Sequence, residues 1–283
     1  MIKKEVLEKL CKKIFEEKPP VLKTGFKDLD IILSGVENSS LITVGARPAM
    51  GKSSFAANIM LNLLEQNKKC LFFSLELSEE LLIKRLLCQI GEVDAHLLKM
   101  PSEISKRKQS IDKILKAVDK LSKYDLTIYD EHFNVEDIKE KIEQVKPEFV
   151  FIDYLQLLDV PSKKPRSESY EKVMKDLKKI AKDNNCIIFI TSQLSRALES
   201  RCDKRPLLSD LRESGAIENI SDVVMFIYRE DYYHSCCDED YEINKGTAEI
   251  IVAKNKYGTM ATIRLLFRSS IMKFLEPESY DVF

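Results

Sequence analysis

Residues 41–66 constrain the fold of this chain more than any other stretch. A mostly apolar run at 41–45 leads into a turn containing Gly51-Lys52-Ser53, and residues 53–66 have the pattern of a helix. A strand, a glycine-containing loop and a helix in this order form a cradle for phosphate, because the loop amides and the helix N-terminus point N–H groups at an anion. The sequence therefore predicts a nucleotide-binding P-loop at the end of a buried strand.

Within this loop, the residue types suit distinct tasks. Lys52 is expected to reach the β- and γ-phosphates, and the Ser53 hydroxyl is expected to bind Mg²⁺. Gly51 suits a position where the backbone approaches phosphate with no room for a Cβ atom. Alanine occupies the first glycine position of the pattern G-x-x-x-x-G-K-[ST], yet the flanking strand and helix argue against a chance Gly-Lys-Ser turn. The predicted nucleotide-binding residues are Ala46, Arg47, Pro48, Ala49, Met50, Gly51, Lys52, Ser53 and Ser54.

Apolar runs and helical patterns alternate along most of the chain. The predicted strands lie at 41–45, 70–74, 126–129, 149–152, 187–191 and 223–228, and the predicted helices at 53–66, 79–90, 135–146 and 168–184. Residues 94–123 read as a Lys-rich helical insertion, and residues 195–210 and 231–247 as polar loops. Closely spaced strands at 248–253, 261–267 and 271–275 predict an antiparallel hairpin at one edge. The pattern indicates an α/β fold with a mainly parallel twisted sheet flanked by helices.

Two predicted strands end in an acidic residue. Asp153 follows the strand at 149–152, and Glu76 follows the strand at 70–74. The carboxyl ends of parallel strands share one edge of a sheet, so we expect Asp153 to bind Mg²⁺ and Glu76 to act as general base on the attacking water. The alternatives are an exposed strand-end aspartate, and a Glu76 that caps the helix starting near Ser78. Spacing alone leaves the two roles of Glu76 open.

A third strand ends at Gln193 and leads into a basic loop. The Gln193 amide suits a sensor that loses a hydrogen bond when a γ-phosphate leaves, although a strand-end turn residue fits the pattern equally well. The loop at 196–212 carries five basic and three acidic residues. It suits contact with the phosphates of a nucleic acid, and a solvated surface loop fits its composition as well. Its basic residues are Arg196, Arg201, Lys204, Arg205 and Arg212.

Composition narrows the class of protein. Lys and Arg total 45 and Asp and Glu total 46, which gives a net charge of −1. Contact with a nucleic acid is therefore expected only through local basic clusters, or through a ring of subunits that concentrates them. No apolar run reaches membrane-spanning length, and we expect no secretory signal. The seven cysteines lack zinc-finger spacing and indicate reduced thiols in the cytoplasm, with Cys236-Cys237 an incidental pair. His96, His132 and His234 share no metal-ligand spacing.

Residues 2–17 read as an amphipathic helix ahead of the main domain. Ile2, Val6, Leu10 and Ile14 recur every fourth residue, and Pro19-Pro20 end the pattern. The apolar stripe needs a surface to cover it, either on its own domain or on a neighbouring subunit, and the pattern leaves that choice open. The predicted division is a helical segment at 1–20 and a main domain at 21–283.

Several blocks of sequence together resemble the signature of DnaB-like replicative helicases. The most specific are Ser192-Gln193-Leu194-Ser195-Arg196 and residues 203–215, which read DKRPLLSDLRESG. The other blocks are residues 24–30, 46–48 leading into Gly51-Lys52-Ser53, 74–76, 152–157 and Tyr228-Arg229. Their order and spacing agree with the family from about residue 22 to residue 276.

The resemblance implies a RecA-like P-loop ATPase that uses ATP and Mg²⁺ and assembles as a homo-hexamer around single-stranded DNA during replication. In this family, Lys52, Ser53, Glu76, Asp153 and Gln193 match ATP-site positions, and Arg212, Glu213 and Gly215 match a DNA-facing loop. Lys254 matches a basic residue that reaches the neighbouring subunit's γ-phosphate. Lys256 stands where an arginine finger is usual, and a lysine lacks the planar fork of arginine. Residues 1–20 match a linker helix that docks on the adjacent subunit.

Two rival functions and one departure accompany this interpretation. The rivals are a RecA- or RadA-like recombinase that coats DNA as a filament, and a non-catalytic module whose assembly a nucleotide controls. The departure is the N-terminal collar that binds primase in the family, because the present sequence starts at the linker. We therefore expect weak or absent stimulation by primase, a possible helicase loader as partner, and travel from 5′ to 3′ as the resemblance suggests.

Overall fold

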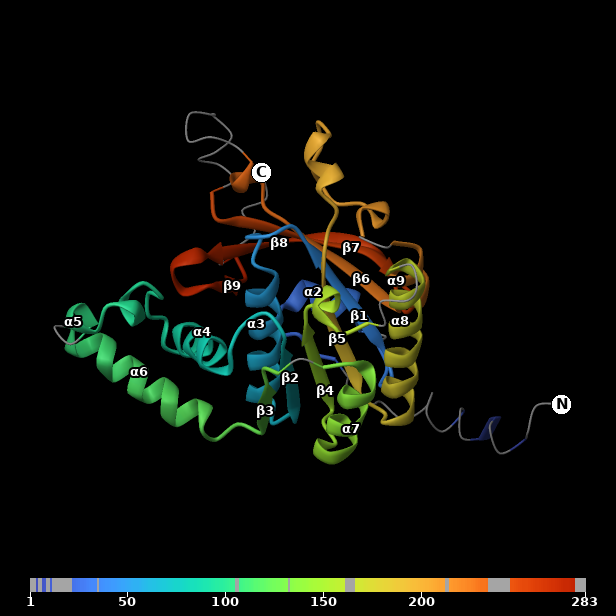
Figure 1. Cartoon of the computed structure of the whole chain (residues 1–283). Helices are drawn as coiled ribbons and strands as arrows, with labels where there is room; N and C mark the ends of the chain where they lie inside the picture. The colour runs from blue at the N-terminus through green and yellow to red at the C-terminus, as the bar shows by residue number, and fades with distance from the viewer. Residues whose placement is uncertain are drawn as a thin grey trace.

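A computed structural model gives the architecture of the chain. It describes residues 4, 7–8, 11, 22–34, 36–104, 107–131, 133–160, 166–211, 214–233 and 245–277. Across these residues a single nine-stranded sheet runs in the order β3-β2-β4-β5-β1-β6-β7-β8-β9 (Figure 1). The parallel strands are β1 (Leu41–Ala46), β2 (Cys70–Ser74), β3 (Leu126–Tyr129), β4 (Phe149–Asp153), β5 (Ile187–Gln193) and β6 (Val223–Tyr228).

Three antiparallel strands extend this sheet at one edge. They are β7 (Thr247–Asn255), β8 (Ala261–Arg268) and β9 (Lys273–Leu275). Burial alternates along β7 and β8, whereas every residue of β1, β2, β4 and β6 is buried. This difference in burial arises because helices cover both faces of the parallel part of the sheet. The mainly parallel sheet and its antiparallel edge are as predicted.

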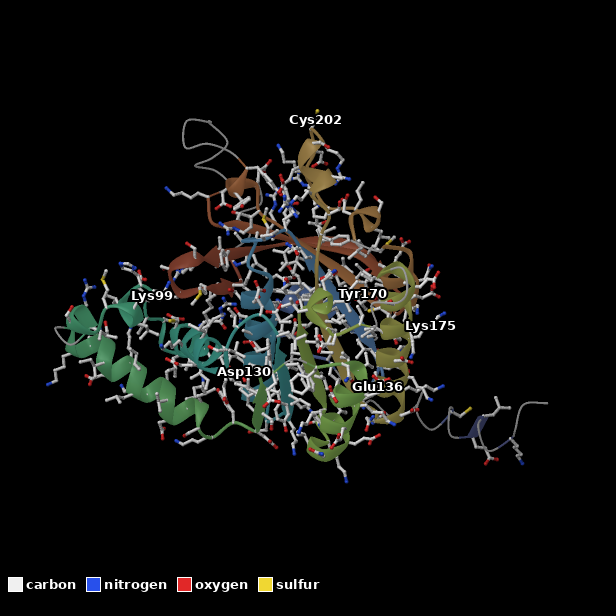
Figure 2. All side chains as sticks on the ribbon, viewed as in Figure 1. Lys99, Asp130, Glu136, Tyr170, Lys175 and Cys202 are labelled. Carbon is white, nitrogen blue, oxygen red and sulfur yellow. The ribbon has the colours of Figure 1, made fainter. Side chains whose placement is uncertain are left out.

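Helices pack on both faces of the sheet. The helices of the described residues are α2 (Lys27–Ile32), α3 (Lys52–Glu65), α4 (Glu79–Gly91), α5 (Pro101–Ile104), α6 (Lys108–Leu121), α7 (Val135–Val145), α8 (Arg166–Asp183) and α9 (Ser214–Ile220). Figure 1 shows α3 on one side of the parallel strands and α7, α8 and α9 on the other, with α4, α5 and α6 extending to one side of the molecule. In Figure 2 the side chains crowd both faces of the sheet, and the labelled Lys99 and Lys175 lie toward opposite sides of the molecule.

Neighbouring residues of each strand enter opposite cores. The α3 side gathers Phe72, Phe151 and Phe189, while the α8 side gathers residues such as Ile152 and Ile190. Phe72, Phe151 and Phe189 sit directly opposite one another on β2, β4 and β5, with stacked rings whose centroids are 5.9 and 4.9 Å apart. This cross-strand stack fixes the register of the three strands that carry the predicted acids and the predicted sensor.

Most predicted elements are confirmed, and the differences have local causes. The short helices α2 and α9 were not predicted, because six or seven residues hardly establish a helical period. The predicted start of β9 at residue 271 was too early, since Ser269–Ile271 form a 3₁₀ turn and Met272 has a φ of 53°. The polar loop at 195–210 contains 3₁₀ turns at Arg196–Ser200 and Leu208–Asp210.

Several predictions fall on residues outside the described part of the chain. They concern nearly all of the helix at 2–17, together with Arg212, Glu213, His132, His234 and Cys236-Cys237. In the described part, no helix has the length and apolarity needed to cross a membrane. The same residues contain no group of three or more His, Cys, Asp or Glu side chains placed to hold a metal ion.

Candidate nucleotide-binding site

The P-loop joins the end of β1 to the start of α3. Gly51 has a φ of 96°, a left-handed conformation that favours glycine. A Cβ atom at this position would lie 2.9 Å from Cζ of Phe274. Ala49 also has a positive φ, of 65°. Backbone conformation and the packing of β9 therefore both require glycine before Lys52.

The N-terminus of α3 is open to an anion. The N-cap residue, Gly51, provides no side-chain cap, and the first turn contains no acidic residue. The first N–H groups of a helix lack partners within it, and they carry the positive end of the helix dipole. The α3 terminus and the glycine loop therefore fit a nucleotide phosphate chain.

Lys52 gathers side chains from three strands. Its Nζ lies 2.8 Å from Oδ1 of Asp153, 3.1 Å from Oγ1 of Thr191 and 3.9 Å from Oε2 of Glu76. It also lies 4.2 Å from the centre of the Tyr154 ring. Glu76 and Asp153, which were predicted to lie at one edge of the sheet, thus converge on the P-loop lysine in the folded chain.

Asp153 is a buried carboxylate, with 3% of its side chain exposed. Burial, the largest influence, raises its pKa, but the Lys52 ammonium and hydrogen bonds from Lys52, Ser53 and Thr191 outweigh burial and hold the pKa below its usual range. Asp153 is consequently ionised at neutral pH. Its carboxylate and the Ser53 hydroxyl supply the hard oxygen donors that Mg²⁺ prefers, so the donor set fits this ion.

Glu76 is positioned by the end of β2 and is not the cap of α4. The helix cap is Ser78, whose Oγ accepts a hydrogen bond from the Leu81 N–H. Ser74 pairs with Asp153 across β2 and β4, which brings Glu76 to the same sheet edge as Asp153. About half of its side chain is exposed, at 47%. Glu76 therefore combines contact with Lys52 and access to solvent, as a base acting on water requires.

Arg85 is a member of this region that the sequence reasoning missed. Burial, the largest influence, lowers the pKa of Arg85, while the Asp153 and Glu76 carboxylates raise it, with a net lowering. An arginine stays charged despite such a shift. Arg85 follows Leu82 by three residues, so it lies on the buried face of α4. A cation on the apolar stripe of a helix was the signal that could have revealed it.

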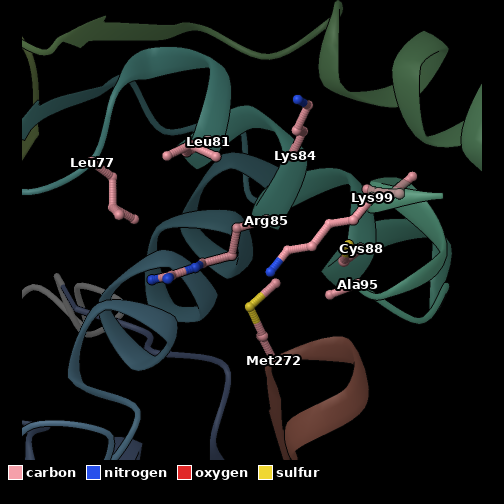
Figure 3. Close-up of a pocket in the computed structure, with 9 residues that line it drawn as sticks. Leu77, Leu81, Lys84, Arg85, Cys88, Ala95, Lys99 and Met272 are labelled. Carbon is pink, nitrogen blue, oxygen red and sulfur yellow. The ribbon is translucent and has the colours of Figure 1, made fainter. Parts of the chain in front are cut away.

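A cavity of about 390 Å³ lies beside Arg85 and opens between α4 and the following turn. Figure 3 shows Arg85, Lys84 and Lys99 among its lining residues, together with Leu81 and Met272. The cavity is therefore apolar in part and carries three cationic side chains.

Gln193 lies beside the first residue of the P-loop. β1 and β5 pair Ala46 with Gln193, and the Gln193 N–H donates to Oε1 of Gln156 at 3.0 Å. Gln156 also donates to Oγ of Ser192 at 2.9 Å. The Gln156 side chain thus holds the Gln193 backbone at the sheet edge that carries Lys52.

Arg47 connects the P-loop to the basic loop. Its guanidinium donates to the Leu194 carbonyl at 2.9 Å and forms two contacts with Oε1 of Glu199, at 2.9 and 2.8 Å. Glu199 belongs to the 3₁₀ turn at Arg196–Ser200. Arg47 therefore links the P-loop directly to this turn.

Two of the predicted DNA-binding arginines hold the basic loop together. Arg201 forms two bonds to the buried Asp210, at 2.6 and 3.2 Å, and Arg205 forms two to Glu249, both at 2.8 Å. Bonds to Glu249 raise the pKa of Arg205 above its usual value. These pairs engage both guanidinium groups within the chain.

The other predicted DNA-binding residues differ in exposure and contacts. Arg196 is exposed, and Lys204 lies 5.3 Å from the Tyr233 ring. Gly215 is exposed near the start of α9, and a Cβ atom there would meet nothing within 4 Å. Arg212 and Glu213, the residues just before α9, fall outside the described residues.

Lys254 and Lys256 lie at the sheet edge opposite the P-loop. Because β7 is antiparallel to β6, its end meets the starts of β6 and β1. Lys256 Nζ lies 3.0 Å from Oδ1 of Asp222, and Lys254 donates to the Glu218 and Asn219 carbonyls. The length of β1, about 17 Å at 3.3–3.4 Å per residue, separates the two edges. Within one chain, these lysines therefore stand a strand length away from Lys52.

Comparison with known proteins shows which proteins this chain is similar to. The family model described as "DnaB-like helicase C terminal domain" matches residues 21–276. The "Replicative DNA helicase DnaB" of Geobacillus stearothermophilus is 38% identical over 90% of this chain and 56% of its own length. The "Replicative DNA helicase DnaC" of Bacillus subtilis (strain 168) is 37% identical with the same coverage. The chain thus spans little more than half the length of these relatives.

Solved structures show the same fold. One of them, described as an ATPase domain, superposes with a TM-score of 0.89 at 32% identity, covering 97% of this chain and 98% of that one. A DnaB-like replicative helicase, described with its interactions with primase, gives a TM-score of 0.87 at 31% identity, covering 98% of this chain and 67% of that one. The predicted RecA-like fold is confirmed.

The contrast between Arg201 and Arg196 can be tested by urea unfolding. Arg201→Ala should lower the free energy of unfolding by about 2 kcal/mol, since it removes the charged partner of a buried Asp210. The matched variant Arg196→Ala removes an exposed arginine from the same loop and should change stability by less than about 0.5 kcal/mol. Equal stability of the two variants would contradict the assignment of Arg201 as a structural residue.

Proposed function

This chain belongs to the DnaB-like helicase C-terminal domain family, and from that premise we propose that it is the ATP-hydrolysing motor of a replicative DNA helicase, acting in the cytoplasm. The observation that carries the proposal is the convergence of Glu76 and Asp153 on Lys52 at the N-terminus of α3. The family also disfavours the two rivals, a recombinase filament and a non-catalytic assembly module.

The residues of the site have separate tasks in hydrolysis. The loop amides and Lys52 bind the phosphates, and Ser53 and Asp153 hold Mg²⁺, which neutralises phosphate charge when bound. Glu76 accepts a proton from the attacking water as its oxygen bonds to the γ-phosphorus. The bond from that phosphorus to the bridging oxygen breaks, and ADP leaves with this oxygen. Gln193 is the proposed sensor of the departing phosphate.

The position of Lys254 and Lys256 supports sites shared between subunits. Both lysines lie about a strand length from the P-loop of their own chain, so they reach a γ-phosphate only if another copy presents one. A closed ring satisfies every such pair, and we propose the homo-hexamer that the family resemblance implies. Lys256 then serves as a positive charge in place of an arginine finger.

The basic loop is the proposed contact with single-stranded DNA. Since Arg201 and Arg205 are engaged within the chain, Arg196 and Lys204 are the described cations best placed for phosphate, with Arg212, Glu213 and Gly215 proposed beside them. A net charge of −1 makes contact by one subunit weak, and repetition around a ring compensates. Arg47 and Glu199 would pass P-loop movement to this loop.

We propose that the segment at 1–20 is a linker helix that docks on an adjacent copy at the cavity beside Arg85. The cavity is lined by the exposed Leu81 together with Lys84 and Lys99. The predicted helix offers an apolar stripe with glutamates, among them Glu5 and Glu8, and lysines between its apolar residues. Burial of the stripe against these side chains and pairing of the acids with lysines would join the two copies.

The helicase proposal predicts strand displacement on a forked duplex with ATP and Mg²⁺. Lys52→Ala should abolish both ATP hydrolysis and displacement, because it removes the cation that binds the phosphates. The matched control is Lys68→Ala, a partly exposed lysine beyond the far end of α3 that pairs with Glu148, and it should leave both activities intact. Full hydrolysis by Lys52→Ala would reject the site. A helicase loader is a proposed partner that can be added to this assay.

Shared sites predict recovery of activity by mixing two inactive variants. Lys52→Ala and Lys256→Ala should each hydrolyse ATP poorly alone. In a random equal mixture, about a quarter of the interfaces join an intact Lys52 to a neighbour's intact Lys256, so about a quarter of wild-type turnover should return. If Lys256 acted within its own chain, mixing would restore nothing.

The docking proposal predicts a loss of assembly in Leu81→Asp. Because Leu81 is half exposed, the variant should fold, while a carboxylate at the cavity would repel the apolar stripe and Glu5 or Glu8. Light scattering after a sizing column should show smaller assemblies. Ile31→Asp is the control, an equally apolar and exposed position on α2 that does not line the cavity. Unchanged assembly of Leu81→Asp would place the helix elsewhere.

A further inference from the structure

We propose that Asp222 is a positioning residue that holds Lys256 folded onto its own subunit, and that Lys178 sets how tightly Lys256 is held. The inference rests on the proposed function, in which Lys256 serves the nucleotide of a neighbouring copy. It adds that Asp222 of the same chain competes with the nucleotide of the neighbouring copy for Lys256.

Asp222 is the meeting point of three elements. Its Oδ1 lies 3.0 Å from Nζ of Lys256, at the end of β7. Its Oδ2 accepts from Nζ of Lys178 on α8 at 2.5 Å and from the Leu41 N–H of β1 at 2.8 Å. Lys178 also donates to the Ser39 carbonyl at 2.7 Å. One carboxylate therefore binds two lysines and a backbone amide.

The side chains of this cluster differ in their contact with solvent. Only 5% of the Asp222 side chain is exposed, against 44% for Lys256. The Lys256 N–H donates to the Asp222 carbonyl at 3.0 Å, which fixes its backbone. A half-exposed ammonium on a fixed backbone can move by side-chain rotation alone. Bound to the buried Asp222, however, this ammonium points back toward its own subunit.

Release of Lys256 leaves Asp222 with partners. Burial is the largest influence on the Asp222 pKa and raises it, but bonds from Lys178, Leu41 and Lys256 outweigh burial and hold the pKa below its usual value. After Lys256 leaves, the Lys178 ammonium and the Leu41 amide still compensate the carboxylate. Asp222 therefore avoids the large free-energy cost of an unpaired buried charge. Lys256 can then exchange between the Asp222 carboxylate and the γ-phosphate of a neighbouring copy.

Substitutions of Asp222 and of Lys178 should have opposite effects on this exchange. Asp222→Asn removes the negative charge and keeps an acceptor for the Leu41 amide, so Lys256 is held less tightly. Lys178→Met removes the competing cation, so Asp222 should hold Lys256 more tightly. Weakening or strengthening a half-exposed ion pair of this kind should change the fraction of subunits with a released Lys256 by about threefold.

The experiment measures steady-state ATP hydrolysis by the full chain at a concentration at which it is assembled. Asp222→Asn should raise kcat about threefold and Lys178→Met should lower it by a similar factor. The KM for ATP should stay unchanged in both, because the P-loop is untouched. Each substitution is repeated in a Lys256→Ala background, where both effects should vanish. If Asp222→Asn fails to fold, Lys178→Met still tests the proposal, because it is expected to lower kcat.

A matched control and two contrary outcomes complete the test. Lys175→Met changes an exposed lysine on the same helix, paired with Glu171 and labelled in Figure 2, and it should leave kcat unchanged. A lower kcat in Asp222→Asn, or an effect that persists in the Lys256→Ala background, would overturn the holding role. The proposed function fails separately, if Lys256→Ala alone leaves hydrolysis at the wild-type rate.

Discussion

The ion pair between Lys52 and Asp153 is the contact around which the rest of the structure is organised. A buried carboxylate and a nearly buried ammonium stabilise each other only if backbone and side chains hold them in contact. Three features provide that geometry: β4 ends at Asp153, α3 begins at Lys52, and Thr191 of β5 bonds to the same carboxylate oxygen. The stacked phenylalanines of β2, β4 and β5 fix the register on which this contact depends.

The antiparallel edge strands give the molecule two chemically distinct ends. The carboxyl ends of the parallel strands carry the phosphate site, whereas the end of β7 brings Lys254 and Lys256 to the amino ends. The phosphate site and the two lysines of one chain are thus separated by about a strand length, so the proposed reaction requires a second copy of the chain. Asp222 lies at the same end, and its bond to Lys256 makes the availability of that lysine depend on residues remote from the nucleotide.

Much of the site was predictable because its chemistry is local in sequence. The P-loop, Asp153 and Glu76 each follow an apolar run, and parallel strands bring such positions to one edge. The basic loop was less predictable. Arg196, Arg201 and Arg205 are the same residue type in one polar segment, and only the positions of Asp210 and Glu249 distinguish a structural arginine from an exposed one. Glu249 lies on β7, far along the chain.

Residue type and spacing within short segments were enough to predict most of the strands, the phosphate loop, the acids at strand ends and the family. Tertiary structure alone decided that Ser78 caps α4 in place of Glu76, that Arg47 binds Glu199, and that Arg85 approaches the site carboxylates. It also decided that Lys178 and Lys256 share Asp222. The physical reason is that charged side chains choose partners by distance in space, and strand order, which spacing leaves open, sets those distances.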